Sequence, residues 1–91
     1  MKTARQLEKI TKGIANHRRI EILYLLDKDP GLTLTNLTTK LNANDKTISE
    51  HTHRLVHSGL IYKYPSGPHV RHELTPLGTI ILKFLRTLEW Y

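Results

Sequence analysis

The chain of 91 residues contains no cysteine, and this absence excludes several kinds of site. Without thiols the protein forms no disulfide, zinc finger or thiolate metal centre. The sequence also lacks a cysteine nucleophile, a glycine-rich phosphate loop and a dense carboxylate cluster. Ser49 lies near His51 and His53, but this pair of residue types on one helix lacks an orienting acid. We therefore predict a protein that is not an enzyme, with no catalytic residue and no cofactor.

Long apolar runs are also missing. The longest is far shorter than the roughly 20 residues that span a membrane. Residues 1–6 are polar and lack the apolar centre of a signal peptide. The absence of cysteine fits a reducing compartment. We therefore expect a cytoplasmic protein with no membrane partner.

The charge balance indicates a polyanionic partner. The formal net charge is +6 and the isoelectric point is about 9.8, which favours nucleic acid first and an anionic membrane surface second. A content of 38% hydrophobic and 24% charged residues is typical of a globular chain. Residues 1–91 are sufficient for a single domain with a modest core, which dimerisation would stabilise.

Hydrophobic periodicity predicts two helices in the first third of the chain. Residues 1–14 hold a weakly amphipathic N-terminal helix, which we expect Gly13 to break. Asn16 is suited to cap a stronger helix over residues 17–26, which ends at the run 27–31. Because apolar residues cover more than half of this second helix, it is predicted to be the central core helix.

Residues 33–58, within a helical core of residues 16–59, have the pattern of a helix-turn-helix. A short helix, capped by Thr33 or Thr35, places leucines at positions 34, 37 and 41 toward the core. After a turn at 42–44, Asn44 caps a second helix that ends at Gly59. One face of this second helix is apolar and contains Ile48 and Leu55. The opposite face is polar and contains Lys46, Glu50, His53, Arg54 and His57.

Residues 60–74 predict a wing. A strand over 60–64, a turn over 65–68 and an alternating strand over 69–74 form a hairpin. Pro76 then opens a C-terminal helix over 76–89. Its wide apolar face consists of Leu77, Ile80, Ile81, Phe84, Leu85 and Leu88. The predicted fold is mainly α with a small β-hairpin: a winged helix-turn-helix of about five helices and a two- or three-stranded wing sheet.

Several stretches resemble the ArsR-type winged helix-turn-helix transcriptional regulators, with the MarR-like winged helices as the broader relatives. The matching positions lie in residues 15–26, in Thr33-Leu34 and Leu37, in residues 47–61, and in Gly67, Val70, His72, Leu74-Thr75 and Gly78. This resemblance implies a homodimer on a pseudo-palindromic DNA site, with the first and last helices at the dimer interface. The interface residues would be Leu7, Ile10, Ile81, Phe84, Leu85 and Leu88. Alternatively, residues 3–14 pack on the apolar face within one chain.

The sequence departs from the metal-sensing members of that family. It has no cysteine pair, and its last helix contains no histidine and only Glu89 as a carboxylate. Thr52 stands where a buried leucine is usual, and Glu50 where a basic or amide residue is common. We therefore predict no metal site. His53 and His57, one helical turn apart, are weak candidates for one, and together with His69 they could instead make DNA binding sensitive to pH.

The expected DNA contacts come from the start of the second motif helix and from the wing, where Lys63, His69 and Arg71 are expected to lie around the tip. The candidates are Asn44, Lys46, Thr47, Ser49, Glu50, Arg54, Lys63, His69 and Arg71. Glu50 either accepts a hydrogen bond from cytosine or pairs with Arg54, four residues on. Lys40 and the pair Arg18-Arg19 are secondary phosphate candidates, and Arg19 could instead serve the structure by pairing with a carboxylate.

These features predict a sequence-specific regulator that binds double-stranded DNA as a homodimer. Two alternatives remain: a weakly specific architectural DNA-binding protein, and a protein-interaction module that does not bind DNA. The sequence identifies no small-molecule effector.

Overall fold

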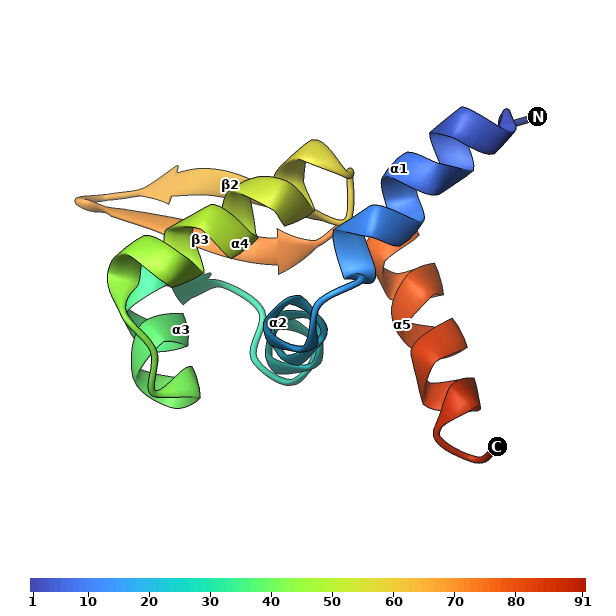
Figure 1. The fold of residues 1–91 in the computed structure, drawn as a ribbon. Helices are drawn as coiled ribbons and strands as arrows, with labels where there is room; N and C mark the ends of the chain where they lie inside the picture. The colour runs from blue at the N-terminus through green and yellow to red at the C-terminus, as the bar shows by residue number, and fades with distance from the viewer.

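The computed structural model describes residues 1–91 as five helices and a three-stranded sheet. The elements are α1 (Ala4–Ile14), α2 (His17–Lys28), β1 (Leu32–Thr33), α3 (Leu34–Leu41), α4 (Asp45–His57), β2 (Ile61–Ser66), β3 (His69–Leu74) and α5 (Pro76–Leu88). Figure 1 shows the sheet and α3 at one end of the molecule, α1 and α5 at the other, and α2 between them. This is the predicted winged helix-turn-helix. None of the helices combines the length and the apolar character that a membrane crossing needs.

Polar side chains set the start of every helix. The N-caps are Thr3, Asn16, Thr33, Asn44 and Thr75, and each side chain accepts a hydrogen bond from a backbone N–H of the first turn. The predicted caps Asn16 and Asn44 are confirmed, and Thr33 rather than Thr35 begins α3. Asn42, in the left-handed region with φ of 50°, ends α3 and produces the tight turn of the motif.

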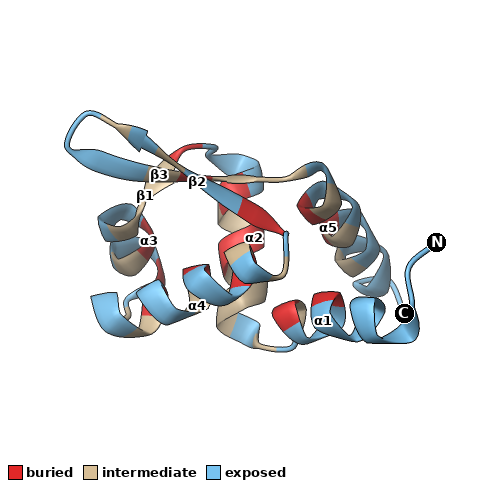
Figure 2. Cartoon of the chain, turned by 90° about the horizontal axis from the view of Figure 1, so that it is seen from above, coloured by how far each residue is buried: buried red, intermediate tan, exposed pale blue.

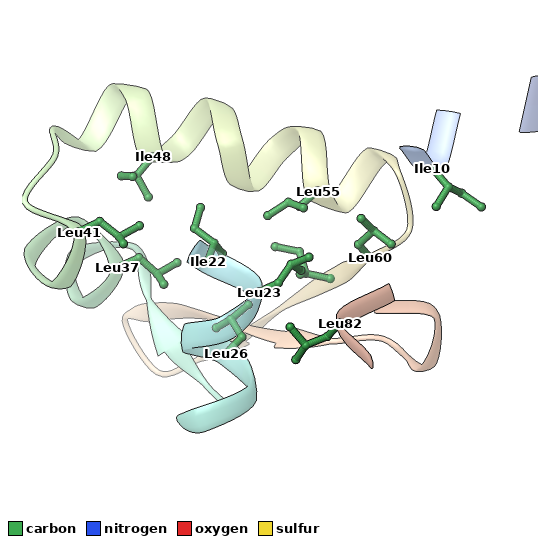
Figure 3. Close-up of a cluster of buried hydrophobic side chains, with 11 residues drawn as sticks. Ile10, Ile22, Leu23, Leu26, Leu37, Leu41, Ile48, Leu55, Leu60 and Leu82 are labelled. Atoms are coloured by element: carbon green, nitrogen blue, oxygen red, sulfur yellow. The ribbon is translucent and has the colours of Figure 1, made fainter. Parts of the chain in front are cut away.

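The core surrounds α2, as the periodicity predicts. Ile22, Leu23 and Leu26 of this helix are almost completely buried. They belong to one cluster of buried apolar side chains that also includes residues from every other helix and from β2 (Figure 3), namely Ile10, Leu37, Leu41, Ile48, Leu55, Leu60, Ile61 and Leu82. Figure 2 shows the same arrangement, with the buried positions gathered on the inward sides of the helices. The buried stripe Ile48–Thr52–Leu55 holds α4 on this core and leaves its other face outside.

The strands pair in the order β1-β3-β2, all antiparallel. β2 is longer than predicted, because Pro65 and Ser66 continue it and pair with Val70 and His69. Pro65 is tolerated there because β2 is an edge strand, whose outer N–H groups need no ladder partner. The turn therefore shrinks to Gly67-Pro68, with Gly67 at a φ of 62°.

Gly13 does not break α1, which continues to Ile14. It is buried against the end of α4, where an ideal Cβ at this position would lie 2.3 Å from Oγ of Ser58. Glycine is therefore required at this position for the close approach of α1 to α4. Glycine inside a helix lowers helix stability relative to alanine, and the contact with α4 offsets this loss.

His72 is buried in the sheet, and its surroundings disfavour the protonated ring. It is 2% exposed, and its Nδ1 lies 2.9 Å from the carbonyl oxygen of Leu32. Burial lowers the pKa of His72 below its usual value, the hydrogen bond to Leu32 opposes this shift, and Lys63 adds to it. As the pH falls, the His72 ring therefore takes up a proton more readily in the unfolded chain than in the folded protein.

We expect the free energy of unfolding to fall as the pH drops below the ordinary histidine pKa of 6.5, and to be retained above it. The measurement is chemical denaturation between pH 7.5 and about pH 5. His72→Asn, whose amide nitrogen can still donate to Leu32, should flatten this dependence. The matched variant His69→Asn, at an exposed position of the same strand, should not. An identical pH dependence in wild type and His72→Asn would contradict the assignment.

Candidate nucleic-acid interface

The outer face of α4 is a continuous polar surface. Lys46, Ser49, Glu50, His53, Arg54 and His57 are all exposed along it. Thr47 is half-buried. Asn44 is exposed, but its Oδ1 accepts the Thr47 N–H at 2.8 Å, so only its amide nitrogen remains free to donate. Because the opposite face is fixed in the core, this polar surface has a defined orientation relative to the sheet.

Glu50 and Arg54 do not form the alternative helix ion pair. The ion pairs of the chain join Arg18 to Glu21, Lys40 to Asp29, and Arg86 to Asp27. Arg54 therefore keeps an uncompensated guanidinium, and Glu50 an uncompensated carboxylate. Both groups are available to an external partner. Arg54 can bind a phosphate or a guanine, and Glu50 can accept a hydrogen bond from a donor such as the cytosine amino group.

The wing residues are spread along the hairpin, not gathered at its tip. Only His69, paired with Ser66, lies beside the Gly67-Pro68 turn. Lys63 and Arg71 were also expected at the tip, but Lys63 pairs with His72 and Arg71 with Tyr64 in the middle of the strands. Arg71 is half-buried and donates from Nη1 to the Gly31 carbonyl at 2.9 Å. Arg71 thus ties the hairpin to the loop before β1, and Lys63 is exposed beside α4.

A polar hollow lies between α4 and β2. Its volume is about 690 Å³, and it is lined by Ser49, Glu50, His53, Arg54, His57 and Lys63. Apart from Glu50, these residues carry a hydroxyl, an imidazole, a guanidinium or an ammonium group. The hollow joins the exposed face of α4 to the hairpin, which is the arrangement that a helix in a groove with a wing on the adjacent backbone requires.

The secondary phosphate candidates have different surroundings. Arg18 donates from Nη1 to the Leu41 carbonyl at 2.9 Å and lies 3.5 Å from Glu21, so it braces α2 against α3. Lys40 lies 3.9 Å from Asp29. Arg19 has no ion pair and faces α1 and α4. Of the three, Arg19 is the one whose charge is uncompensated.

The histidines do not gather around one point. His53 and His57 are both exposed on α4. No group of three His, Asp or Glu side chains lies close enough to hold a metal ion. His53 and His57 therefore contribute to the polar face as hydrogen-bonding imidazoles.

The residues predicted for a dimer interface divide into two groups. Ile10 is buried in the chain's own core, and Ile81 and Leu85 are half-buried against it. Leu7, Phe84 and Leu88 are about half exposed, at 50%, 54% and 48%. Ile80 is 62% exposed one turn before Phe84, although the sequence-based interface did not include it. The 80-84-88 spacing on one helix could have identified it.

The comparisons with known proteins agree with this geometry. The sequence pattern of the MarR family matches residues 15–67, more than half of the chain. The transcriptional regulator HlyU from Vibrio vulnificus is 26% identical, with a TM-score of 0.77 over 93% of this chain and 88% of that one. A comparison with curated protein sequences gave no match.

Two further solved structures share the fold. One is the homodimeric winged helix-turn-helix DNA-binding domain of a possible ArsR-family regulator from Mycobacterium bovis. It is 21% identical, with a TM-score of 0.85 over 93% of this chain and 79% of that one. The other is a MepR variant from S. aureus bound to an oligodeoxyribonucleotide. It is 19% identical, with a TM-score of 0.78 over 92% of this chain and 64% of that one.

Proposed function

The chain belongs to the MarR family, and from this premise we propose that it is a transcriptional regulator that binds a specific double-stranded DNA sequence as a homodimer. The observation that carries the proposal is the outward polar face of α4, with its uncompensated Arg54 and Lys46. Family and fold are those of transcriptional regulators and indicate no catalytic function. The narrower ArsR-type resemblance is not singled out, because the family pattern that matches is that of MarR.

In the proposed complex, the N-terminal half of α4 enters the major groove. Lys46, Thr47 and Ser49 lie on its first turns and would contact base edges and the nearest phosphates. Lys63 and His69 on the hairpin would meet the backbone beside the groove. The net charge of +6 would draw the protein to DNA at any sequence, so specificity must come from α4.

A second copy of this chain is the proposed partner of the exposed apolar face on α5. Ile80, Phe84 and Leu88 form a ridge at successive turns, and Leu7 of α1 is exposed as well. A contiguous row of exposed apolar side chains of this kind is typical of a protein–protein interface. A two-fold dimer would place two α4 helices on the half-sites of an inverted repeat.

The test is selection of bound duplexes from a random DNA pool at moderate salt. An enriched inverted repeat is the expected result, and its half-site spacing reports the separation of the two α4 helices. Binding without enrichment would favour the weakly specific architectural protein. No binding at low salt would favour the interaction module, for which the uncompensated Glu50 is the one supporting observation.

Lys46→Ala and Arg54→Ala should each weaken binding to the selected duplex by about thirtyfold or more, because each removes one charged contact of roughly 1–3 kcal/mol from both half-sites of the dimer. Loss of a base contact by Arg54 would also relax the preference at one position of the site, whereas a phosphate contact would not. Fluorescence anisotropy with labelled duplexes measures both effects. Lys28→Ala, at an exposed lysine on the far end of α2, is the control. Wild-type affinity in both α4 variants would refute the orientation of this helix.

A further inference from the structure

A second basic surface lies on the other side of α4, between this helix, α1 and the start of α2. This hollow, here called the α1 groove, has a volume of about 600 Å³. Its basic lining comes from three helices: Lys9 and Lys12 of α1, Arg19 of α2, and His51, Arg54 and His57 of α4. Glu50 is its only acid. The lysines and arginines of the groove therefore outnumber its single carboxylate, and the net charge of the groove is positive.

The cations of the α1 groove lack partners within the protein. None of Lys9, Lys12, Arg19 and Arg54 takes part in an ion pair. The Nε of Arg19 is in addition buried without a hydrogen-bond acceptor. A buried donor without an acceptor lowers stability, and native proteins usually satisfy it. An anionic oxygen in the groove would supply the missing acceptor once the Arg19 side chain turns this N–H into the groove, because the atom has almost no exposed surface in the free protein.

The electrostatic potential around His51 also favours an anion in the α1 groove. His51 lines the groove, and burial lowers its pKa, with the nearby Arg19 as the next largest cause. His17 and Arg18 also act to lower this pKa, whereas Glu50 opposes them. A positive potential that disfavours a proton on His51 favours a bound anion in the same place.

The position of α1 is fixed by a contact that only glycine allows. Gly13 packs directly on Ser58 at the end of α4, and Figures 1 and 2 both place α1 beyond that end of α4. Lys9 and Lys12 are therefore held beside the outer face of α4. Lys9 is about 200° around the helix from Leu7 at 100° per residue, so a dimer formed through Leu7 leaves the lysines free.

We propose that the α1 groove binds a phosphodiester of the DNA flanking the segment that α4 reads, through Lys9, Lys12 and Arg19. The proposal rests on the proposed function. A DNA phosphate is favoured as the anion because Glu50, Arg54 and His57 line both this groove and the hollow beside β2. The two surfaces are thus continuous across α4. The groove also has only one apolar lining residue, Ala15, and so offers little for the body of an organic ligand.

Because the proposed dimer forms through α1 and α5, the α1 groove faces the DNA between the two half-sites and the wing faces outward. The test therefore compares two duplexes that contain one half-site, a short one that ends at its inner edge and one extended past that edge. The wild-type protein should bind the extended duplex more tightly, by roughly tenfold at low salt. The double variant Lys9→Gln/Lys12→Gln should lose this gain but still bind the short duplex. Its salt dependence on the extended duplex should be shallower by about 0.9 in log-log slope for each phosphate that it no longer neutralises.

The matched control is Lys28→Gln/Lys83→Gln, which removes the same charge at two exposed lysines outside the groove. An equal loss of the gain in this control would overturn the proposal, because general charge would then explain the effect. So would a wild-type protein that gains nothing from the extension. If wild type binds neither duplex, the proposed function fails first. A shift of the His51 ring resonances by inorganic phosphate, combined with no gain from the extension, would assign the groove to a free anion instead and overturn the DNA contact.

Discussion

Gly78→Ala is expected to lower the melting temperature by roughly 10–20 °C, because the added methyl group would collide with the backbone of Leu60. An ideal Cβ at position 78 would lie 2.0 Å from the carbonyl oxygen of Leu60 and 3.0 Å from its carbonyl carbon. Both are backbone atoms of a residue with no exposed surface. The carbonyl also accepts the Thr75 N–H at 3.1 Å, so moving it would disturb the start of α5 as well as the junction of α4 and β2.

Overpacking of this kind costs about 1–3 kcal/mol and occasionally more. In a domain of this size each kcal/mol corresponds to a melting shift of about 4–8 °C. Thermal unfolding followed by far-ultraviolet circular dichroism measures the shift. Thr79→Ala, one residue further along α5 and exposed, should melt close to wild type. A wild-type melting temperature for Gly78→Ala would show that α5 does not approach Leu60 as closely as described.

The parts of the fold that depend on neighbouring residues could be predicted from the sequence. Helix starts depend on one cap side chain and the next three N–H groups, so Asn16 and Asn44 were identified correctly. The apolar stripe of α4 is likewise a local pattern. The pairing of Leu32 with His72 joins residues far apart in the chain, and no local signal specifies it. The sequence therefore left the choice between two and three strands open.

In the candidate site, too, the features that depend on local sequence could be predicted, and those that depend on distant residues could not. Exposure of the polar face of α4 follows from its periodicity, and the structure has that face outside. The position of Arg71 depends on the Gly31 carbonyl, 40 residues away, so the expectation of a wing-tip arginine was wrong. The α1 groove was missed because it requires α1 and α4 to be adjacent. Its one sequence signal, a glycine inside a helical pattern, was interpreted as a break instead of a packing position.

The last helix shows how periodicity alone can misplace a face. Its six predicted apolar positions omit Leu82, which together with Gly78 is one of the two buried residues of α5. The side of α5 that contacts its own domain is thus centred near Leu82, and the exposed ridge runs through Ile80, Phe84 and Leu88. This division is what makes the exposed ridge available to a second copy of the chain.

Phe84→Glu is therefore expected to convert the proposed dimer to a monomer and to weaken binding to the selected inverted repeat by a factor of about 100 or more. In a two-fold dimer the substitution occurs twice in one interface, and it places a carboxylate where each ring would be desolvated. Two losses of about 2 kcal/mol or more, the range of a central aromatic contact, are sufficient for a factor of this size. Light scattering after gel filtration measures the mass, and anisotropy the affinity.

The matched control is Thr79→Glu, which adds the same charge to an exposed position of α5, about 140° around the helix from Phe84. It should remain dimeric and bind DNA as wild type does. Phe84 is 54% exposed in the single chain, so Phe84→Glu should not disturb the fold of the monomer. The variant should melt as a wild-type monomer does, and it should bind an isolated half-site with the affinity of a wild-type monomer. Retained half-site binding would show that α4 is intact and that the lower affinity arises from the missing second copy. A Phe84→Glu protein that stays dimeric would refute this interface and leave α5 without the proposed role.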